Sequence, residues 1–173
     1  MSGHRLAHPR DSLPWRIANL SALGGEAVLL LRSPWRAVIS SWNHLHMRAV
    51  DTDLDTPEFH RFALEEARRW REVAVDWLLS SPRLLVVHYE HLKEDTEREI
   101  RRIVAFLRLE PDEQRLVCMR DKKFEGFLRK HKKQIVNPYR PEARAALTEA
   151  AEDVQKILRA TNQPPLPFHL YSM

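Results

Sequence analysis

The chain has 173 residues, a length typical of one domain with a substantial core. Hydrophobic residues make up 43% of it, and the net charge is only +4, which excludes a disordered, collagen-like or strongly acidic chain. The single cysteine, Cys118, excludes an internal disulfide and a cysteine-based zinc module. No apolar run reaches the roughly 20 residues that a membrane span needs, and no apolar signal-peptide centre is visible, so we expect a soluble chain.

The first half of the chain predicts a strand and then two helices. Residues 1–23 show no sustained period and are expected to be irregular. The apolar run at 26–31 is typical of a central parallel strand that is covered on both faces. Pro34, with Ser33 as cap, predicts a helix to about residue 48. Thr56-Pro57 predicts a long helix to about Leu79, with these residues on its inward face: Phe59, Phe62, Trp70, Val73 and Trp77.

The second half predicts another strand and three more helices. RLLVVHY at 83–89 is a second buried strand, and Asp95 caps an amphipathic helix. A shorter helix to Met119, a basic loop at 120–140 and a final helix from Pro141 follow. Two sets of residues should face inward: Ile100, Ile103, Val104 and Leu107, and then Leu147, Ala151, Val154 and Leu158.

Alternation of strands and helices predicts an α/β fold with a parallel sheet flanked by helices. We divide the chain into an irregular N-terminal segment at 1–25, a domain at 26–160 and a proline-rich tail at 161–173.

Arg32 and Ser40 are candidates for binding an anion. The four glycines of the chain cannot form either of the common glycine-rich phosphate loops, so any phosphate must use other groups. Arg32 follows the first predicted strand and precedes a helix whose free N–H groups point the same way. Ser40 lies about two turns along that helix, where its hydroxyl could reach the same phosphate. Alternatively, Arg32 pairs with a carboxylate and Ser40 bonds to the backbone.

A basic segment at 120–133 is the second candidate. It is dense in lysine and arginine and carries Phe124 and Phe127. Such density can hold a polyanion, a phosphate or nucleic acid, although a solvated loop is the usual reading of a bare charge run. Phe127 could dock the loop on the core and direct Arg129 and Lys130 inward.

We predict no metal site. Strand alternation sends His88 and His91 to opposite faces, and His44 and His46 lie about 200 degrees apart around their helix. Tyr89-Glu90 could line a pocket, but we interpret the pair as structural, capping the loop and fixing Lys93 or a nearby arginine.

Taken in order, these segments resemble the sulfotransferase family that uses 3′-phosphoadenosine 5′-phosphosulfate as donor. LLLRSPWRAVIS matches a strand ending in Arg with Pro two and Ser eight residues on. VVHYEHLKEDTEREIRRIVAFL is similar to the family's strand ending in Tyr-Glu and the amphipathic helix after it. FLRKH at 127–131 resembles its Phe and Arg-Lys-Gly loop, with His131 where glycine is usual. These sequence motifs most resemble the sulfotransferase domain of WSC-domain-containing proteins, and the resemblance covers about residues 26–160.

The resemblance implies a nucleotide site made by Arg32, Ser40, Arg129 and Lys130, which would hold the 3′-phosphate of the donor. It implies a P-loop-NTPase-like sulfotransferase fold that here lacks the N-terminal strand and the loop for the 5′-phosphosulfate. His4 and His8 do not stand in the family's context for a general base, so the catalytic residues stay open. We therefore expect an incomplete domain with weak or no activity alone.

The expected partners are the nucleotide donor and a hydroxyl or amine of a carbohydrate or small molecule as acceptor, without a metal. The acceptor itself cannot be read from the sequence. Intact relatives are expected to be Golgi membrane proteins. Two alternatives stay open: a module that binds nucleic acid through the basic segment, which the modest net charge disfavours, and a non-catalytic interaction domain.

Overall fold

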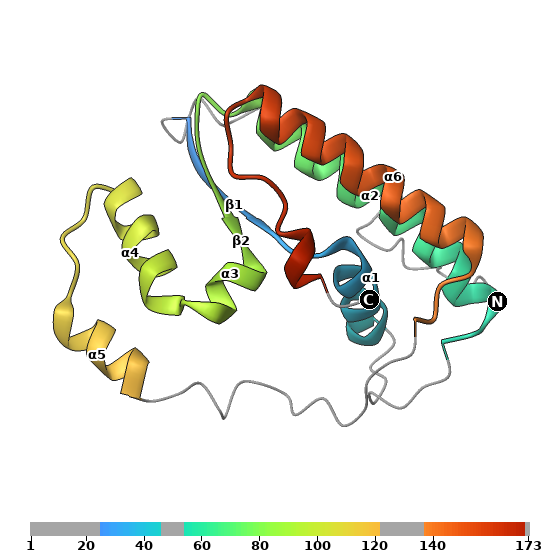
Figure 1. Cartoon of the computed structure of the whole chain (residues 1–173), viewed down its shortest axis with the longest axis horizontal. Coiled ribbons are helices and arrows are strands. Elements are labelled where there is room, and N and C mark those ends of the chain that lie inside the picture. Colours follow the sequence, from blue (N-terminus) through green and yellow to red (C-terminus); the bar gives the residue numbers. More distant parts are fainter. Residues whose placement is uncertain (1–24, 46–53, 122–136, 172–173) are drawn as a thin grey trace, which may run out of the picture.

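A computed structural model describes residues 25–45, 54–121 and 137–171 of the chain (Figure 1). Its elements in chain order are β1 (Glu26–Leu31), α1 (Pro34–Leu45), α2 (Pro57–Ser80), β2 (Arg83–His88), α3 (Tyr89–Glu94), α4 (Thr96–Phe106), α5 (Glu113–Asp121), α6 (Pro141–Ala160) and the short 3-10 helix η2 (Phe168–Leu170). The strands pair in parallel, with Leu31 opposite His88. Helices α2 and α6 lie side by side on one side of the strands and α3 and α4 on the other. The predicted α/β class with a parallel sheet is confirmed.

The two strands are short apolar runs, as their sequences predict, but β1 is only half covered. Leu29 and Leu31 are buried toward α2 and α6, whereas Val28 and Leu30 are 40% and 53% exposed. Helix α4 packs against β2 and leaves the opposite face of β1 open. The prediction of a strand covered on both faces is therefore wrong within the part of the chain that the structure describes.

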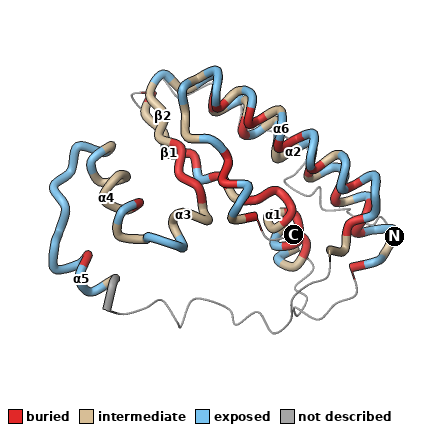
Figure 2. The backbone as a smooth tube through the Cα atoms, viewed as in Figure 1, coloured by how far each residue is buried: buried red, intermediate tan, exposed pale blue. Residues whose placement is uncertain are grey.

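Most of the core lies between α2 and α6, together with α1 (Figure 2). Helix α2 begins where Thr56 accepts a hydrogen bond from the Phe59 N–H (3.2 Å), which confirms the predicted start. Val73, however, is 49% exposed, so its predicted inward position is wrong. The buried stripe of α2 contains Ala63, Ala67 and Ala74, and small side chains let a neighbouring helix approach closely. The facing side of α6 is as predicted, with these residues buried: Leu147, Ala151, Val154 and Leu158.

Helix α4 has the predicted start but not the predicted burial. Asp95 caps it by accepting from the Arg98 N–H (3.0 Å). None of the four predicted inward residues is fully buried, and Leu107 is exposed. The one buried residue of α4 is Glu99, whose carboxylate pairs with Arg98 and Arg102. Periodicity identified the helix, but it could not show that a glutamate would be its buried residue.

The proline-rich segment after α6 returns across the carboxyl ends of the strands. Leu166 and Tyr171 are buried, and the Leu166 N–H donates to Gln155 Oε1 (2.7 Å). The ring Nε2 of His88 donates to the carbonyl oxygen of Pro164 (3.1 Å). This segment therefore contributes to the core, while the division of the chain at residue 160 stays a prediction.

Asp55 joins two segments that are 85 residues apart. Its carboxylate accepts from His60 Nε2 (2.8 Å) and from Arg140 Nη2 (3.0 Å). The hydrogen bond from His60, followed by that from Arg140, lowers the pKa of Asp55. The contact ties the start of α2 to the start of α6.

We expect the Asp55→Asn variant to melt at a lower temperature than the unchanged chain near neutral pH, with a difference that shrinks in acid. A carboxyl group with a lowered folded pKa stabilises the fold above its unfolded value of about 3.9 and loses this contribution as the pH falls through the folded value. Thermal melts of both chains at about pH 7 and about pH 3 check this. An equal difference at both pH values would contradict the role of the charge.

Candidate functional site

The carboxyl ends of β1 and β2 bring two pairs of consecutive residues together. Arg32 and Ser33 follow β1, while Tyr89 and Glu90 follow β2. The guanidinium of Arg32 lies over the ring of Tyr89, 4.7 Å from its centroid. The Ser33 N–H donates to Glu90 Oε1 (3.0 Å). Since Leu31 is opposite His88 in the ladder, these contacts continue the strand register past the end of the sheet.

Several polar atoms at this edge are buried without a hydrogen-bond partner among the described residues. They are Arg32 Nε, Ser33 Oγ, Glu90 Oε2 and Tyr171 Oη. Buried polar groups in folded proteins are nearly always paired with protein, water or a ligand. The edge therefore has unused donors, including one on a guanidinium, which is the group best suited to a phosphate.

Helix α1 points its N-terminus at the same edge. Ser33 occupies the cap position, since its carbonyl accepts from the Ala37 N–H (2.8 Å). Its hydroxyl makes no capping bond, so the predicted cap is formed by the backbone alone. The N-terminus of a helix carries partial positive charge and free N–H groups, which favour an anion. Glu90 already uses the Ser33 N–H, so a ligand would meet the N–H groups further into the first turn.

Ser40 lies on the exposed side of α1, two turns from Ser33. Its side chain is not hydrogen-bonded to Arg32 in the described structure, where Arg32 instead stacks on Tyr89. The structure thus places Arg32 at the predicted strand end and leaves Ser40 accessible. It does not bring the two together without a ligand.

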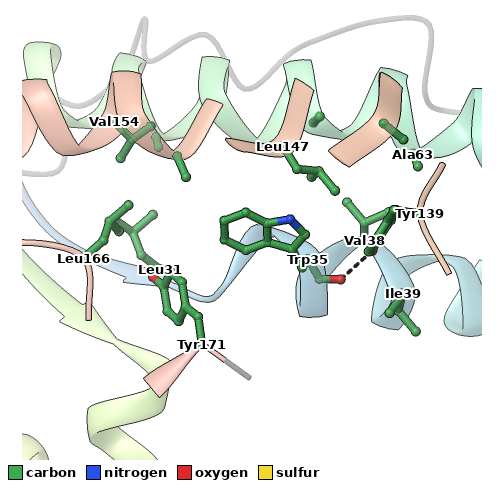
Figure 3. Close-up of a cluster of buried hydrophobic side chains, with 14 of the residues drawn as sticks. Leu31, Trp35, Val38, Ile39, Ala63, Tyr139, Leu147, Val154, Leu166 and Tyr171 are labelled. Carbon is green, nitrogen blue, oxygen red and sulfur yellow. Dashed lines mark hydrogen bonds between the residues drawn. The ribbon is translucent and has the colours of Figure 1, made fainter. Parts of the chain in front are cut away.

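Two aromatic residues contact Trp35 at the first turn of α1, next to this edge (Figure 3). Tyr139 donates its hydroxyl to the carbonyl oxygen of Trp35 (2.5 Å), as the dashed line shows. The ring of Tyr171 packs edge-on against Trp35, with 6.0 Å between centroids. Tyr171 therefore packs against the first turn of α1, which follows Arg32 in the chain. Burial, and secondarily the charge of Glu90, raise the pKa of Tyr171, so its hydroxyl stays protonated at neutral pH.

Sequence reasoning missed that Tyr139 and Tyr171 contact Trp35 beside this edge. Tyr139 follows the basic segment, and Tyr171 stands in the proline-rich tail, where no helical or strand period marks an inward residue. The only local signal is an aromatic residue within a polar or proline-rich stretch, and such a signal does not name a partner. In contrast, the interpretation of Tyr89-Glu90 as a pair that caps the loop and fixes a cation agrees with the contacts to Ser33 and Arg32.

The other predicted site residues lie outside the ranges that the structure describes. Arg129, Lys130 and His131 lie in residues 122–136, and His4 and His8 lie in residues 1–24, beyond the described ranges. Their predicted roles stay untested.

The prediction that His88 and His91 point to opposite faces of one strand is wrong. His91 lies on α3 rather than on the strand, and the two ring centroids are 5.5 Å apart. Burial lowers the pKa of His88, which favours a neutral ring. In the described ranges, no three histidine, cysteine or acidic side chains are grouped so that they could hold a metal ion.

The fold and the matched segments define the class of this protein. The chain belongs to the sulfotransferase family, because the family model described as "Sulfotransferase family" matches residues 26–113, about half of the chain. This match confirms the resemblance stated from the sequence, and it spans β1, α1, β2 and therefore both pairs of residues at the candidate site.

The chain is similar to three insect proteins named as WSCD family members. The one from Drosophila pseudoobscura pseudoobscura is 29% identical over 142 residues, covering 77% of this chain and 45% of the relative. The one from Drosophila melanogaster is 28% identical over 142 residues (77% and 44%), and that from Aedes aegypti 26% over 143 residues (78% and 45%). The chain thus spans less than half the length of these relatives. No solved structure matches it.

Within the described residues, no helix is both long enough and apolar enough to cross a membrane. This finding concerns only the helices from α1 to η2.

Proposed function

We propose that the carboxyl edge of β1 and β2 binds the 3′-phosphate of 3′-phosphoadenosine 5′-phosphosulfate, the donor of the sulfuryl group. The acceptor would be a hydroxyl or amine of a carbohydrate or small molecule, and the proposal needs no metal ion. Membership of the sulfotransferase family supports the class of reaction. The observation that carries the location is the buried Nε of Arg32, which has no hydrogen-bond partner among the described residues and lies at the end of β1, beside the N-terminus of α1.

Each proposed residue has a distinct task. Arg32 offers a planar fork to the phosphate, and Ser40 adds a hydroxyl from the exposed side of α1. Arg129 and Lys130 would neutralise the same phosphate from the basic segment. Each charge-assisted hydrogen bond would contribute about 1.5–3 kcal/mol.

The anchoring of Tyr139 supports a convergence of the two segments. Tyr139 follows residues 122–136 in the chain, and its hydroxyl is bonded to Trp35 in the first turn of α1. Tyr139 therefore anchors the chain to the first turn of α1 after the basic segment. This gives Arg129 and Lys130 an attachment point three residues from Arg32 in sequence.

Transfer itself needs a base that takes the proton from the acceptor and a cation that stabilises the charge developing on the leaving oxygen. We assign neither role to a residue of this chain. Weak or absent turnover of the chain alone, and the Golgi location of intact relatives, both stay predictions.

A calorimetric titration tests the proposed function. We expect 3′-phosphoadenosine 5′-phosphate to bind saturably and at least about tenfold more tightly than adenosine 5′-phosphate, because only the former carries the 3′-phosphate. Equal affinity for the two nucleotides would contradict the assigned phosphate site.

The same titration separates the alternatives. Binding of any polynucleotide, with an affinity that falls steeply as salt rises, would instead indicate a nucleic-acid-binding module. A folded chain that binds no nucleotide would be a non-catalytic interaction domain.

A further inference from the structure

We infer that Glu90 is the positioning residue of the candidate phosphate site, acting through the backbone of Ser33 to hold Arg32 and the first turn of α1 in place. The inference rests on the proposed function, since the position it fixes is that of a phosphate-binding arginine. Its basis is the hydrogen bond from the Ser33 N–H to Glu90 Oε1 (3.0 Å), which joins residues 57 apart in sequence.

The position of this bond in the backbone lets it set the angle between β1 and α1. Ser33 stands between Arg32, which ends the strand, and Pro34, which begins α1. Proline has no N–H, so the Ser33 N–H is the last backbone donor before the first turn of the helix. A partner at this atom fixes the angle at which the chain leaves the sheet and enters α1.

Neighbouring contacts do not fix the same angle. The Trp70 indole N–H donates to the Arg32 carbonyl oxygen (3.2 Å), which holds the strand side of the turn. The bond from Tyr139 to the Trp35 carbonyl holds the helix side. Between them the Ser33 carbonyl oxygen accepts from Ala37 within α1, and among the described residues the Glu90 carboxylate is the partner from outside the turn that bonds to Ser33, at its N–H.

The carboxylate is also placed to act by geometry rather than by charge. Its Oε1 accepts the Ser33 N–H, while Oε2 is buried and has no partner among the described residues. A negative charge beside a phosphate would weaken phosphate binding, so charge alone predicts tighter binding when Glu90 is neutralised. Positioning predicts that binding survives only where an acceptor remains opposite Ser33. These two effects can be separated by substitution.

The test is a series of variants titrated with 3′-phosphoadenosine 5′-phosphate by calorimetry. Glu90→Gln keeps a carbonyl oxygen at the same reach and is expected to bind as tightly as the unchanged chain, or more tightly. Glu90→Asp keeps the charge but is one methylene shorter and should bind several-fold more weakly. Glu90→Ala removes the acceptor and should weaken binding at least about tenfold.

A second measurement shows whether the hydrogen bond from the Ser33 N–H is lost when Glu90 is substituted. Hydrogen exchange at the Ser33 amide should be slow in the unchanged chain and in Glu90→Gln, and faster in Glu90→Ala. Thermal melts of every variant identify any that fails to fold, in which case the Gln and Asp variants carry the test.

The outcomes distinguish a failure of the positioning role from a failure of the proposed function. Equal or tighter binding by both Glu90→Asp and Glu90→Ala would overturn the positioning role and leave the proposed function standing. An unchanged chain that is folded but binds no nucleotide would overturn the proposed function, and the inference with it. The graded order Gln, Asp, Ala supports both.

Discussion

The Phe59→Ala variant is expected to lose about 3–5 kcal/mol of unfolding free energy. Phe59 has no exposed surface and packs against the ring of Trp42, with 5.5 Å between centroids, and against Tyr139 at 5.6 Å. Its removal leaves a cavity where α1, α2 and the segment before α6 meet. For a domain of this size the loss is a large part of the total stability. Urea denaturation, followed by circular dichroism, measures it.

Val73→Ala is the matched control for Phe59→Ala. Val73 lies on the same helix, but it is 49% exposed, and truncation of a surface side chain changes stability by about 0.5 kcal/mol or less. Similar losses in the two variants would contradict the orientation of α2 described here, because α2 would then bury both residues.

Removing the guanidinium of Arg32 is expected to weaken binding of 3′-phosphoadenosine 5′-phosphate by about 10- to 100-fold, the equivalent of one charge-assisted hydrogen bond. Arg32 is half-buried and stacks on Tyr89, and its Nε has no hydrogen-bond partner in the described ranges, so the guanidinium is held in place before a ligand arrives. Calorimetric titration of Arg32→Ala measures the loss.

The control for Arg32→Ala is Arg68→Ala, which removes an equal charge from the exposed side of α2, where Arg68 pairs with Glu72. A surface pair of this kind contributes little to stability. Should both variants weaken nucleotide binding equally, the effect would be one of net charge, and Arg32 would not be a specific ligand of the phosphate.

The starts of the helices could be predicted because their signals are local. Pro34, Thr56-Pro57 and Pro141 each stand where the structure begins a helix, and a cap or a fixed φ angle acts over one turn of chain. The apolar strands could be predicted for the same reason, since burial favours a short β-branched run. Their parallel pairing followed from the helices that separate them.

Coverage by distant elements could not be predicted in the same way. Whether Val28 and Leu30 on β1 are covered depends on where α4 packs, and α4 packs against β2. Whether α4 buries its apolar stripe depends on its neighbours, and the structure buries Glu99 instead. The periodicity of a helix shows which residues share a face, but not which face meets the protein.

In the candidate site, too, local features could be predicted and contacts between distant segments could not. Arg32 could be placed at a strand end from its own neighbours in sequence. Its contact with Tyr89, and that of Ser33 with Glu90, depend on the register of two strands more than 50 residues apart. Tyr171 reaches Trp35 only because the tail after α6 folds back across the strand ends. The apolar run at 83–89 predicts Tyr89 as the end of a strand, whereas the structure begins the short helix α3 there, which the sequence did not predict.

The central claim is that the end of β1 and the basic segment hold one phosphate. A double-mutant cycle of titrations with 3′-phosphoadenosine 5′-phosphate tests it most directly, using the unchanged chain, Arg32→Ala, Arg129→Ala/Lys130→Ala and the combined variant. The account predicts that each variant binds the nucleotide at least about tenfold more weakly than the unchanged chain. It also predicts a coupling energy of more than about 0.5 kcal/mol between the two sets of substitutions, as expected for side chains that bind the same phosphate. Unchanged affinity in Arg129→Ala/Lys130→Ala would contradict the claim.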